Sequence, residues 1–234
     1  MSAPFWNDRA LRGGIYIAST RPEHCEQLEK LQQTVFPTLA SEELLRAEHY
    51  HRHLEIFPEG QFVALDQGRV VGMTSTLRLA GQTAESPHTF AEVVDGGWFT
   101  SHDPTGDWLY GADVGTHPDY RGKGIGRGLY AARQHTVRQL GLKGQLTVGM
   151  LQGLSRRSDG CGPEQHYEEV VAGKVFDPTV SVQMKIGFTP AGLIRDYVND
   201  PVCLNCGARL VLRADREVHA AWANDAPENS QAAS

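Results

Sequence analysis

The sequence predicts an α/β fold, and two patterns in the chain lead to this prediction. The first is a strand–loop–helix–strand unit, in which an apolar strand at 108–116 precedes a helix at 124–140 and a second strand at 146–151. A right-handed crossover makes the two strands of such a unit parallel. The second pattern is a hairpin within 62–79, whose two strands flank a turn at 66–68. Because hairpin strands pair antiparallel, the expected sheet is mixed.

The other elements follow from hydrophobic periodicity and from turn and cap residues. Apolar residues at helical spacing predict a helix at 22–34, and Ser41 is a candidate N-cap for another helix that starts there. The expected strands are 14–18, 62–65, 70–79, 108–116, 146–151, 188–198 and 207–213. The expected helices after Ser41 are 124–140, 163–172 and 178–186.

The domain organisation is expected to be simple. Residues 1–213 are predicted to form a single domain, because a chain of 234 residues can bury a substantial core. Two irregular inserts interrupt it, at 80–106 and 152–176, and the first is expected to act as a lid or to hold a short helix near 89–94. Residues 214–234 have little apolar pattern and are expected to form a flexible C-terminal tail.

Composition and charge narrow the class of protein. Hydrophobic residues make up 40% of the chain, which excludes wholesale disorder, and no apolar run approaches the length of a membrane span. The N-terminus lacks the basic and then apolar pattern of a signal peptide, so a cytoplasmic protein is expected. A net charge of −6 argues against nucleic-acid binding and is compatible with a cationic amine substrate.

The loop at 117–127 is predicted to bind an anion. Its three glycines leave no Cβ between ligand and backbone, so successive N–H groups can close around a phosphate at the start of a helix. The loop lacks the Gly-Lys-Ser/Thr ending of a nucleoside-triphosphatase loop and the glycine spacing of a dinucleotide-binding fingerprint. The alternative to an anion site is a plain turn before a helix. The residues expected to contact the anion are Arg121, Gly122, Lys123, Gly124, Ile125, Gly126 and Arg127.

Two motifs resemble those of the GNAT N-acyltransferase superfamily. Arg121, Gly124 and Gly126 match its acyl-CoA loop, Arg/Gln-x-x-Gly-x-Gly/Ala, and Lys-Ile-Gly-Phe at 185–188 is similar to its Lys-x-Gly-Phe. The chain more closely resembles the acetyltransferase half of bacterial proteins that fuse a GNAT domain to a carbon–nitrogen hydrolase, and the resemblance covers residues 15–213. The stretches that carry this closer resemblance are 102–107 and 177–185.

This resemblance implies the GNAT fold, with a mixed twisted sheet of about six to seven strands, helices on both faces and a splayed central pair of strands. It also implies that acetyl-CoA is the co-substrate and lies in the gap between the splayed strands. Main-chain groups of Val114, Gly115 and Thr116 are then expected to contact its pantetheine arm. An N–H near Val114 is expected to polarise the thioester carbonyl.

Asp113 is the candidate catalytic base, because burial in the central strand can raise the pKa of a carboxylate into a useful range. Alternatively, Asp113 has a structural role or binds the substrate's charge. The weaker candidates for the base are Tyr110, Glu92 and His117. In the family, a Tyr on the motif helix commonly protonates the thiolate, and Gln183 stands at that position near the cofactor. Since Gln is no acid, the CoA thiolate leaves unassisted or another group protonates it.

Cys203 and Cys206 have the spacing of a metal-ligand pair, but the chain offers no second pair, so no metal site is expected. Turn residues on both sides of them indicate the tip of a hairpin instead. An accessible dithiol at such a tip could still oxidise or bind adventitious metal.

The predicted function is transfer of an acetyl group from acetyl-CoA to a primary amine, with a small metabolite as the first choice of acceptor. A peptide or protein amino group is the next choice. A non-catalytic acyl-CoA-binding module and a nucleotide-binding protein are alternatives from other classes, and a homodimer is left open. Acceptor recognition is assigned to the two inserts. The carboxylates in or next to the inserts that could bind a cation are Glu92, Asp95, Asp103, Asp107, Glu168 and Glu169.

Overall fold

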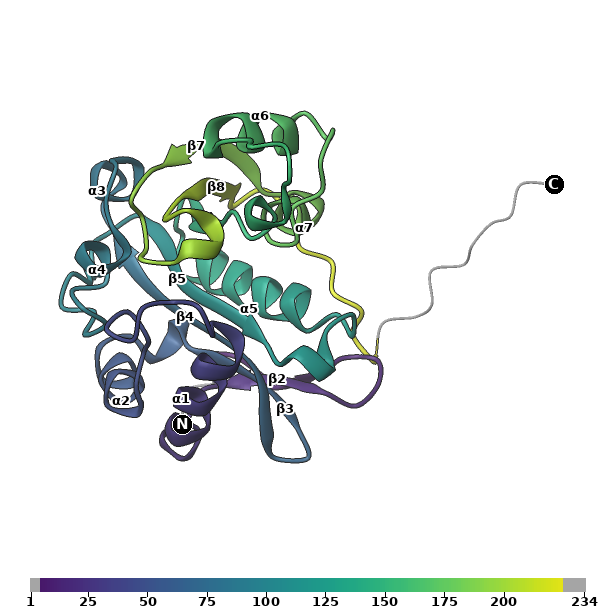
Figure 1. Cartoon of the computed structure of the whole chain (residues 1–234). Coiled ribbons are helices and arrows are strands. Elements are labelled where there is room, and N and C mark those ends of the chain that lie inside the picture. Colours follow the sequence, from purple (N-terminus) through teal and green to yellow (C-terminus); the bar gives the residue numbers. More distant parts are fainter. Residues whose placement is uncertain (1–4, 225–234) are drawn as a thin grey trace.

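The computed structural model describes residues 5–224, which form a mixed sheet of eight strands with helices on both of its faces (Figure 1). The strand order is β1-β2-β3-β4-β5-β6-β8-β7, in which β5 and β6 pair in parallel and the other neighbours pair antiparallel. The predicted α/β class and the mixed sheet are therefore confirmed. The strands are β1 Arg9–Ala10, β2 Tyr16–Ser19, β3 Phe62–Asp66, β4 Arg69–Leu79, β5 Trp108–Thr116, β6 Gly144–Met150, β7 Thr189–Ile194 and β8 Gly207–Arg213.

The sheet has one strand more than the expected six to seven strands, and the additional strand is β1. Its two residues, Arg9 and Ala10, pair with Ile17 and Tyr16 of β2. A strand of two residues is too short to show the alternation of polar and apolar side chains by which the longer strands were predicted.

Helices cover both faces of the sheet (Figure 1). On one face, Leu129 of α5 joins a buried cluster with Ile17 and Phe62. On the other face, Leu28 of α1 packs in a second cluster with Val63. Phe62 and Val63 are neighbours in β3, so the alternation of side chains along a strand divides the core between the two faces. The helices are α1 Cys25–Val35, α2 Ala47–Ile56, α3 Gly81–Glu85, α4 Phe90–Val93, α5 Ile125–Gln139, α6 Pro163–Val171 and α7 Val180–Ile186.

Helix α2 begins later than the sequence suggested. Residues 41–43 form a turn, and the N-cap of α2 is Arg46 rather than Ser41. The backbone N–H of Arg46 donates to Nδ1 of His49 (3.1 Å), so a side chain from the first turn satisfies the helix start. A histidine in this role leaves no Ser, Thr, Asp or Asn signature at the boundary, which explains why the start was misplaced.

Part of the expected tail packs against the rest of the domain. Trp222 forms an isolated bridge with Leu11, is 6% exposed, and has its ring centroid 6.2 Å from that of Trp6. One buried aromatic residue can anchor a segment whose remaining composition is polar. Residues 225–234 of the expected tail lie outside the described residues.

The central strands β5 and β6 separate at one end, as the fold prediction required. Their pairing ends with Gly111 opposite Thr147. Beyond this point β5 stays paired with β4 as far as Thr116, and β6 stays paired with β8 as far as Met150. Ala112 is an extra residue in the β4–β5 register, and such a bulge bends its strand. We call the space between the diverging ends of β5 and β6 the splay, and the Gly111–Thr147 pair its apex.

Candidate functional site

The glycine-rich loop connects the open end of β5 to the start of α5. Gly122 and Gly124 have φ values of +79° and +81°, a left-handed conformation that favours glycine. A Cβ built at either residue, or at Gly126, would meet no atom within 4 Å, so the space beside the loop backbone is open. The N–H groups at 125–127 lie in the first turn of α5 and have no partner earlier in the helix. A phosphate fits both the open space and these donors.

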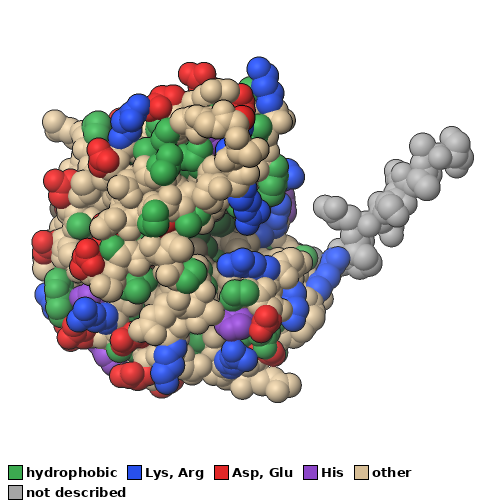
Figure 2. All heavy atoms as spheres, viewed as in Figure 1, with side chains coloured by type: hydrophobic (Ala, Val, Ile, Leu, Met, Phe, Trp, Pro, Cys, Tyr) green, Lys and Arg blue, Asp and Glu red, His purple; other side chains and the backbone are tan. Residues whose placement is uncertain are grey.

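Basic side chains surround this loop. Arg121 and Lys123 are exposed, and the guanidinium of Arg127 donates to the carbonyl of Lys185 at the end of α7 (3.5 Å). Ile125 is buried in the core beneath the loop. Figure 2 shows a recess near the middle of one face of the molecule, with Lys and Arg side chains gathered along one side of it. The loop is thus anchored by an apolar side chain and surrounded by positive charge.

The end of β5 presents a different surface on each face of the sheet. Val114 and Thr116 are half-buried, and Val114 packs against the cluster that includes α5. Asp113 and Gly115 are buried on the other face, where a Cβ at Gly115 would lie 3.1 Å from Val35 of α1. Past the apex, the β5 edge that faces β6 has no strand partner among the described residues. Main-chain groups of β5 along this edge of the splay are therefore not paired with another described strand.

Asp113 is buried and accepts three hydrogen bonds. Its Oδ1 accepts from the backbone N–H of Ser75 (2.5 Å), and its Oδ2 accepts from Nε2 of Gln32 (2.7 Å) and from the hydroxyl of Tyr50 (3.2 Å). Burial raises the pKa of Asp113 to about 6, although the hydrogen bonds from Ser75 and Tyr50 act in the opposite direction. A carboxylate with this pKa is ionised at neutral pH and can accept a proton at small cost.

Gln183 faces the inside of the molecule from α7. Its Nε2 donates to the hydroxyl of Tyr130 on α5 (2.8 Å), and its Oε1 lies so close to Gly149 of β6 that a Cβ there would overlap it. That Oε1 has no hydrogen-bond partner in the described part of the chain. Tyr130 is also buried, which raises its pKa. Nothing in the sequence distinguishes Tyr130, because its position on the buried side of α5 looks like ordinary core.

Arg133, nearly one turn further along α5, is a second buried polar group that was not predicted from the sequence. Its side chain is 0% exposed, and its guanidinium lies 4.9 Å from the ring centroid of Tyr130. A Cβ at Gly111 would overlap the guanidinium, so the glycine makes room for it. None of its three side-chain nitrogens has a hydrogen-bond partner within residues 5–224. A glycine inside a central strand signals such a close approach, and Gly111 was the available clue.

The weaker candidates for the base make contacts of their own. The hydroxyl of Tyr110 lies 2.9 Å from that of Tyr197, and the carboxylate of Glu92 accepts from the backbone N–H of Thr89 at the start of α4 (2.8 Å). Nδ1 of His117 accepts from a backbone N–H two residues further along (3.3 Å). None of these contacts places the three side chains next to Asp113.

Several of the candidate carboxylates in or next to the inserts are already engaged. Asp107 forms an ion pair with Lys143 (2.5 Å), and Glu169 forms one with Arg157 (2.7 Å). Asp103 accepts from a backbone N–H within its own turn (2.8 Å). These groups are therefore less available to a cationic substrate than their sequence suggested.

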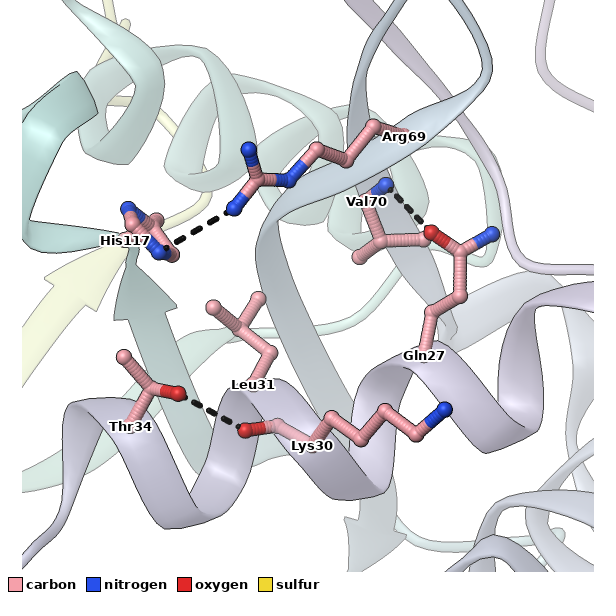
Figure 3. Close-up of a pocket in the computed structure, with 7 residues that line it drawn as sticks. All are labelled: Gln27, Lys30, Leu31, Thr34, Arg69, Val70 and His117. Carbon is pink, nitrogen blue, oxygen red and sulfur yellow. Dashed lines mark hydrogen bonds between the residues drawn. The ribbon is translucent and has the colours of Figure 1, made fainter.

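A separate hollow of about 180 Å³ lies between α1 and the β3–β4 hairpin (Figure 3). Arg69 extends across it toward His117, whose Nε2 lies 3.3 Å from the guanidinium. Its ionisable lining groups are basic or imidazole, so it does not suit a cationic amine. The hollow is lined by Gln27, Lys30, Leu31, Thr34, Arg69, Val70 and His117.

Cys203 and Cys206 are free, buried thiols in the turn between β7 and β8, as the hairpin prediction required. Burial raises the pKa of Cys203 to about 12, so this thiol stays protonated. Within the described ranges, no group of three or more His, Cys, Asp or Glu residues is placed to hold a metal ion. No helix of that same part of the chain combines the length and the apolar character needed to cross a membrane.

Comparison with known proteins identifies the family. The model for the Acetyltransferase (GNAT) family matches residues 25–153, a range that includes β5, the glycine-rich loop and α5. The chain belongs to this family, as its two motifs predicted.

Two curated relatives come from Bacillus subtilis (strain 168). The "Uncharacterized N-acetyltransferase YkwB" is 31% identical over 183 residues, which cover 78% of this chain and 81% of that protein. The "Probable hydrolase YhcX" is 32% identical over 186 residues, which cover 80% of this chain but 36% of that protein. The chain therefore spans about a third of the second relative, which agrees with the expected resemblance to one part of a longer protein.

Solved structures share the fold. The GphF GNAT-like decarboxylase in complex with isobutyryl-CoA aligns with a TM-score of 0.72 and 23% identity, covering 85% of this chain and 98% of that one. The putative acetyltransferase yncA from Salmonella typhimurium, with its cofactor acetyl-CoA, aligns with a TM-score of 0.56 and 14% identity. The alignment covers 88% of this chain and 96% of that one. At these identities the likeness establishes the GNAT fold alone.

Proposed function

We propose that the protein is an N-acetyltransferase that transfers an acetyl group from acetyl-CoA to a primary amine, with a small metabolite as the acceptor. The observation that carries this proposal is the junction of the open splay with a glycine-rich loop whose backbone faces empty space. This junction offers one place for a phosphate and one for an extended arm, which together match the shape of a CoA thioester. Family membership and the acyl-CoA complexes of two structural neighbours support the same choice of donor.

The pyrophosphate of CoA is assigned to the loop. Backbone N–H groups at 122–127 would donate to its oxygens, and Arg121, Lys123 and Arg127 would add positive charge around it. The pantetheine arm would run along the free edge of β5 and bond to main-chain groups at 114–116. Gln183 would then lie beside the arm, because its amide packs against β6 across the splay.

The chemistry needs one bond to form and one to break. The amine nitrogen attacks the thioester carbonyl carbon, the C–S bond breaks, and CoA leaves as a thiolate while the amine loses a proton. A backbone N–H near Val114 would stabilise the negative charge that develops on the carbonyl oxygen. Holding both reactants in the splay would supply much of the rate enhancement, because it replaces a bimolecular encounter.

Asp113 is the proposed base. Its raised pKa suits proton acceptance near neutral pH, and Tyr50, which donates to its Oδ2, provides a route through one hydroxyl. Gln183 has no proton to give, and its Nε2 is committed to Tyr130. The thiolate is a weak base, so it can leave without an acid.

Direct binding and turnover measurements test this function. Acetyl-CoA, CoA and ATP are titrated into the protein by calorimetry, and thiol release is then followed against a panel of small amines and short peptides. We expect acetyl-CoA and CoA to bind, ATP to bind far more weakly, and a small amine to accelerate thiol release. Binding without turnover on any amine would favour a non-catalytic acyl-CoA-binding module, which the absence of an acid at Gln183 would explain.

A further inference from the structure

The apex of the splay contains a charged group that receives no hydrogen-bond acceptor from the other described residues. The guanidinium of Arg133 is 0% exposed, and its Nε and both Nη atoms have no hydrogen-bond partner within residues 5–224. A buried cation without partners is costly, and proteins normally pair such a group with a carboxylate or several acceptors. The guanidinium has five donors in a planar fork that fits a carboxylate with two parallel hydrogen bonds.

Nearby side chains do not supply this partner. The ring of Tyr130 lies 4.9 Å from the guanidinium carbon and offers a π face instead of a carboxylate. Asp113 lies close enough to influence Arg133 electrostatically, but its own hydrogen bonds connect it to Ser75, Gln32 and Tyr50. The N–H donors of the Arg133 guanidinium therefore remain without acceptors from the described residues.

Arg133 lies where the acyl end of a CoA ester would arrive. Its guanidinium packs against Gly111, the last residue of β5 that pairs with β6. Along α5 it is eight residues from Ile125, or roughly 12 Å from the phosphate end of the helix at 1.5 Å per residue. A phosphate held by the loop therefore cannot also neutralise Arg133. A group further along the same ligand can do so.

We propose that Arg133 selects acyl donors that carry a terminal carboxylate, such as malonyl-CoA or succinyl-CoA. This inference rests on the proposed function and refines its donor. The carboxylate would accept two hydrogen bonds from the guanidinium at the apex, while the thioester stays beside β5. Acetyl-CoA would still bind through its phosphates and pantetheine, but it leaves Arg133 without a partner. In the transfer, the C–S bond breaks and the amine nitrogen receives the carboxyacyl group, whose carboxylate takes no part.

The test compares donors that differ in charge but hardly in shape. Calorimetry measures the Kd of malonyl-CoA against isovaleryl-CoA, and of succinyl-CoA against 4-methylpentanoyl-CoA, in which an isopropyl group replaces the carboxylate. In the unchanged protein we expect each carboxyacyl ester to bind about tenfold to a hundredfold more tightly than its neutral counterpart, the range of a charge-assisted hydrogen-bond pair. Equal affinities, or a preference for the neutral esters, would overturn the proposal without any variant being needed.

Two variants then locate the effect. Arg133→Met keeps an unbranched side chain for the core, and we expect it to remove the preference while leaving the Kd of isovaleryl-CoA within about twofold. Arg133→Lys keeps a charge and should retain part of the preference. If Arg133→Met instead weakens all four esters equally, Arg133 holds the pantetheine arm and the proposal fails. Free CoA is titrated in parallel, so a loss of all CoA binding would be recognised as failure of the proposed function.

Discussion

Near the end of β5, the two faces of the strand differ in packing and in hydrogen bonding, although the same few residues form both. On the α5 face, Val114 and Thr116 are half-buried beside the splay, and the loop that follows has open space at its glycines. On the α1 face, Asp113 is buried with three hydrogen bonds, and Gly115 is closely packed. We call the first face, where we propose that acetyl-CoA contacts main chain, the ligand face. We call the second, a network of side chains completed by the protein itself, the buried face.

This difference shows which kind of site tolerates change. Main-chain donors depend on glycines and on the start of a helix, so they fail only when backbone space is lost. A buried carboxylate depends on every donor around it, and one substitution alters both its charge and its partners. Substitutions on the two faces should therefore have separable effects on donor binding and on turnover.

The largest effect is expected on the buried face. Asp113→Asn keeps the shape of the side chain but removes its basicity, so turnover should fall by about 10²–10⁴ while the Kd of acetyl-CoA changes little. Steady-state kinetics and calorimetry measure the two quantities. With the native carboxylate, the acidic limb of the rate profile should fall near pH 6, the pKa of Asp113, and this limb should vanish in the variant.

Two other outcomes would assign Asp113 a different role. Near-normal turnover with a raised KM for the amine would mean that the carboxylate binds the substrate's charge. No change in either parameter would make it structural, and the contrast between the two faces would then concern packing alone.

The same carboxylate should give the stability of the protein a defined pH dependence. Burial raises the pKa of Asp113 from 3.8 to about 6, so the folded protein binds this proton more tightly than the unfolded chain does. The resulting stabilisation is fully present below about pH 4 and is lost as the pH rises through 6. The two pKa values correspond to a change of about 3 kcal/mol in the free energy of unfolding.

Denaturant unfolding of the native protein and of Asp113→Asn between pH 4 and 7.5 isolates this contribution. Since the amide does not titrate, the variant should gain stability relative to the native protein as the pH rises. Parallel pH curves for both proteins would mean that Asp113 titrates as an exposed carboxylate does.

On the ligand face, the sharpest substitution is Gly126→Ala. Gly126 lies in the first turn of α5 and is absent from the glycines with positive φ, so alanine is not strained there and its methyl group enters the open space assigned to the pyrophosphate. We expect acetyl-CoA affinity to fall by about tenfold or more while thermal stability is kept or slightly raised, since Ala favours helix over Gly. Calorimetry and thermal unfolding measure both.

Gly162→Ala is the matched control, because Gly162 also has negative φ and lies at the start of a helix, α6. Among the described residues, a Cβ there would meet only Oε2 of Glu164, at 3.9 Å. It should leave acetyl-CoA binding unchanged. If Gly126→Ala binds acetyl-CoA as the native protein does, the loop does not hold the pyrophosphate.

The smallest effect is expected from Arg121→Ala. The exposed guanidinium can add one charge-assisted hydrogen bond to a phosphate that the backbone already holds, so binding should weaken by about 1–2 kcal/mol. Calorimetry in low and high salt measures this term, which should shrink as salt screens it. A much larger loss would show that side chains, rather than main-chain donors, dominate the ligand face.

The sequence revealed the ligand face more fully than the buried face, for a physical reason. Strand β5 and the helix after it were predicted closely because their signals are local: an apolar run, then glycines, then helical periodicity. The two side-chain donors to Asp113 come from Gln32 and Tyr50, 81 and 63 residues away along the chain. No local pattern announces such partners. Arg133 was missed for the same reason, because only its contact with Gly111 distinguishes it from a surface arginine.

The bridge between Trp222 and Leu11 has a practical consequence for expression. Composition alone would place a cloning boundary after residue 213, at the end of β8. A polypeptide ending there would lose the indole that covers Trp6 and would expose apolar surface beside the first strands. Poor solubility of such a fragment would then reflect the missing aromatic cover. A shortened version of this protein should therefore keep every residue through 224.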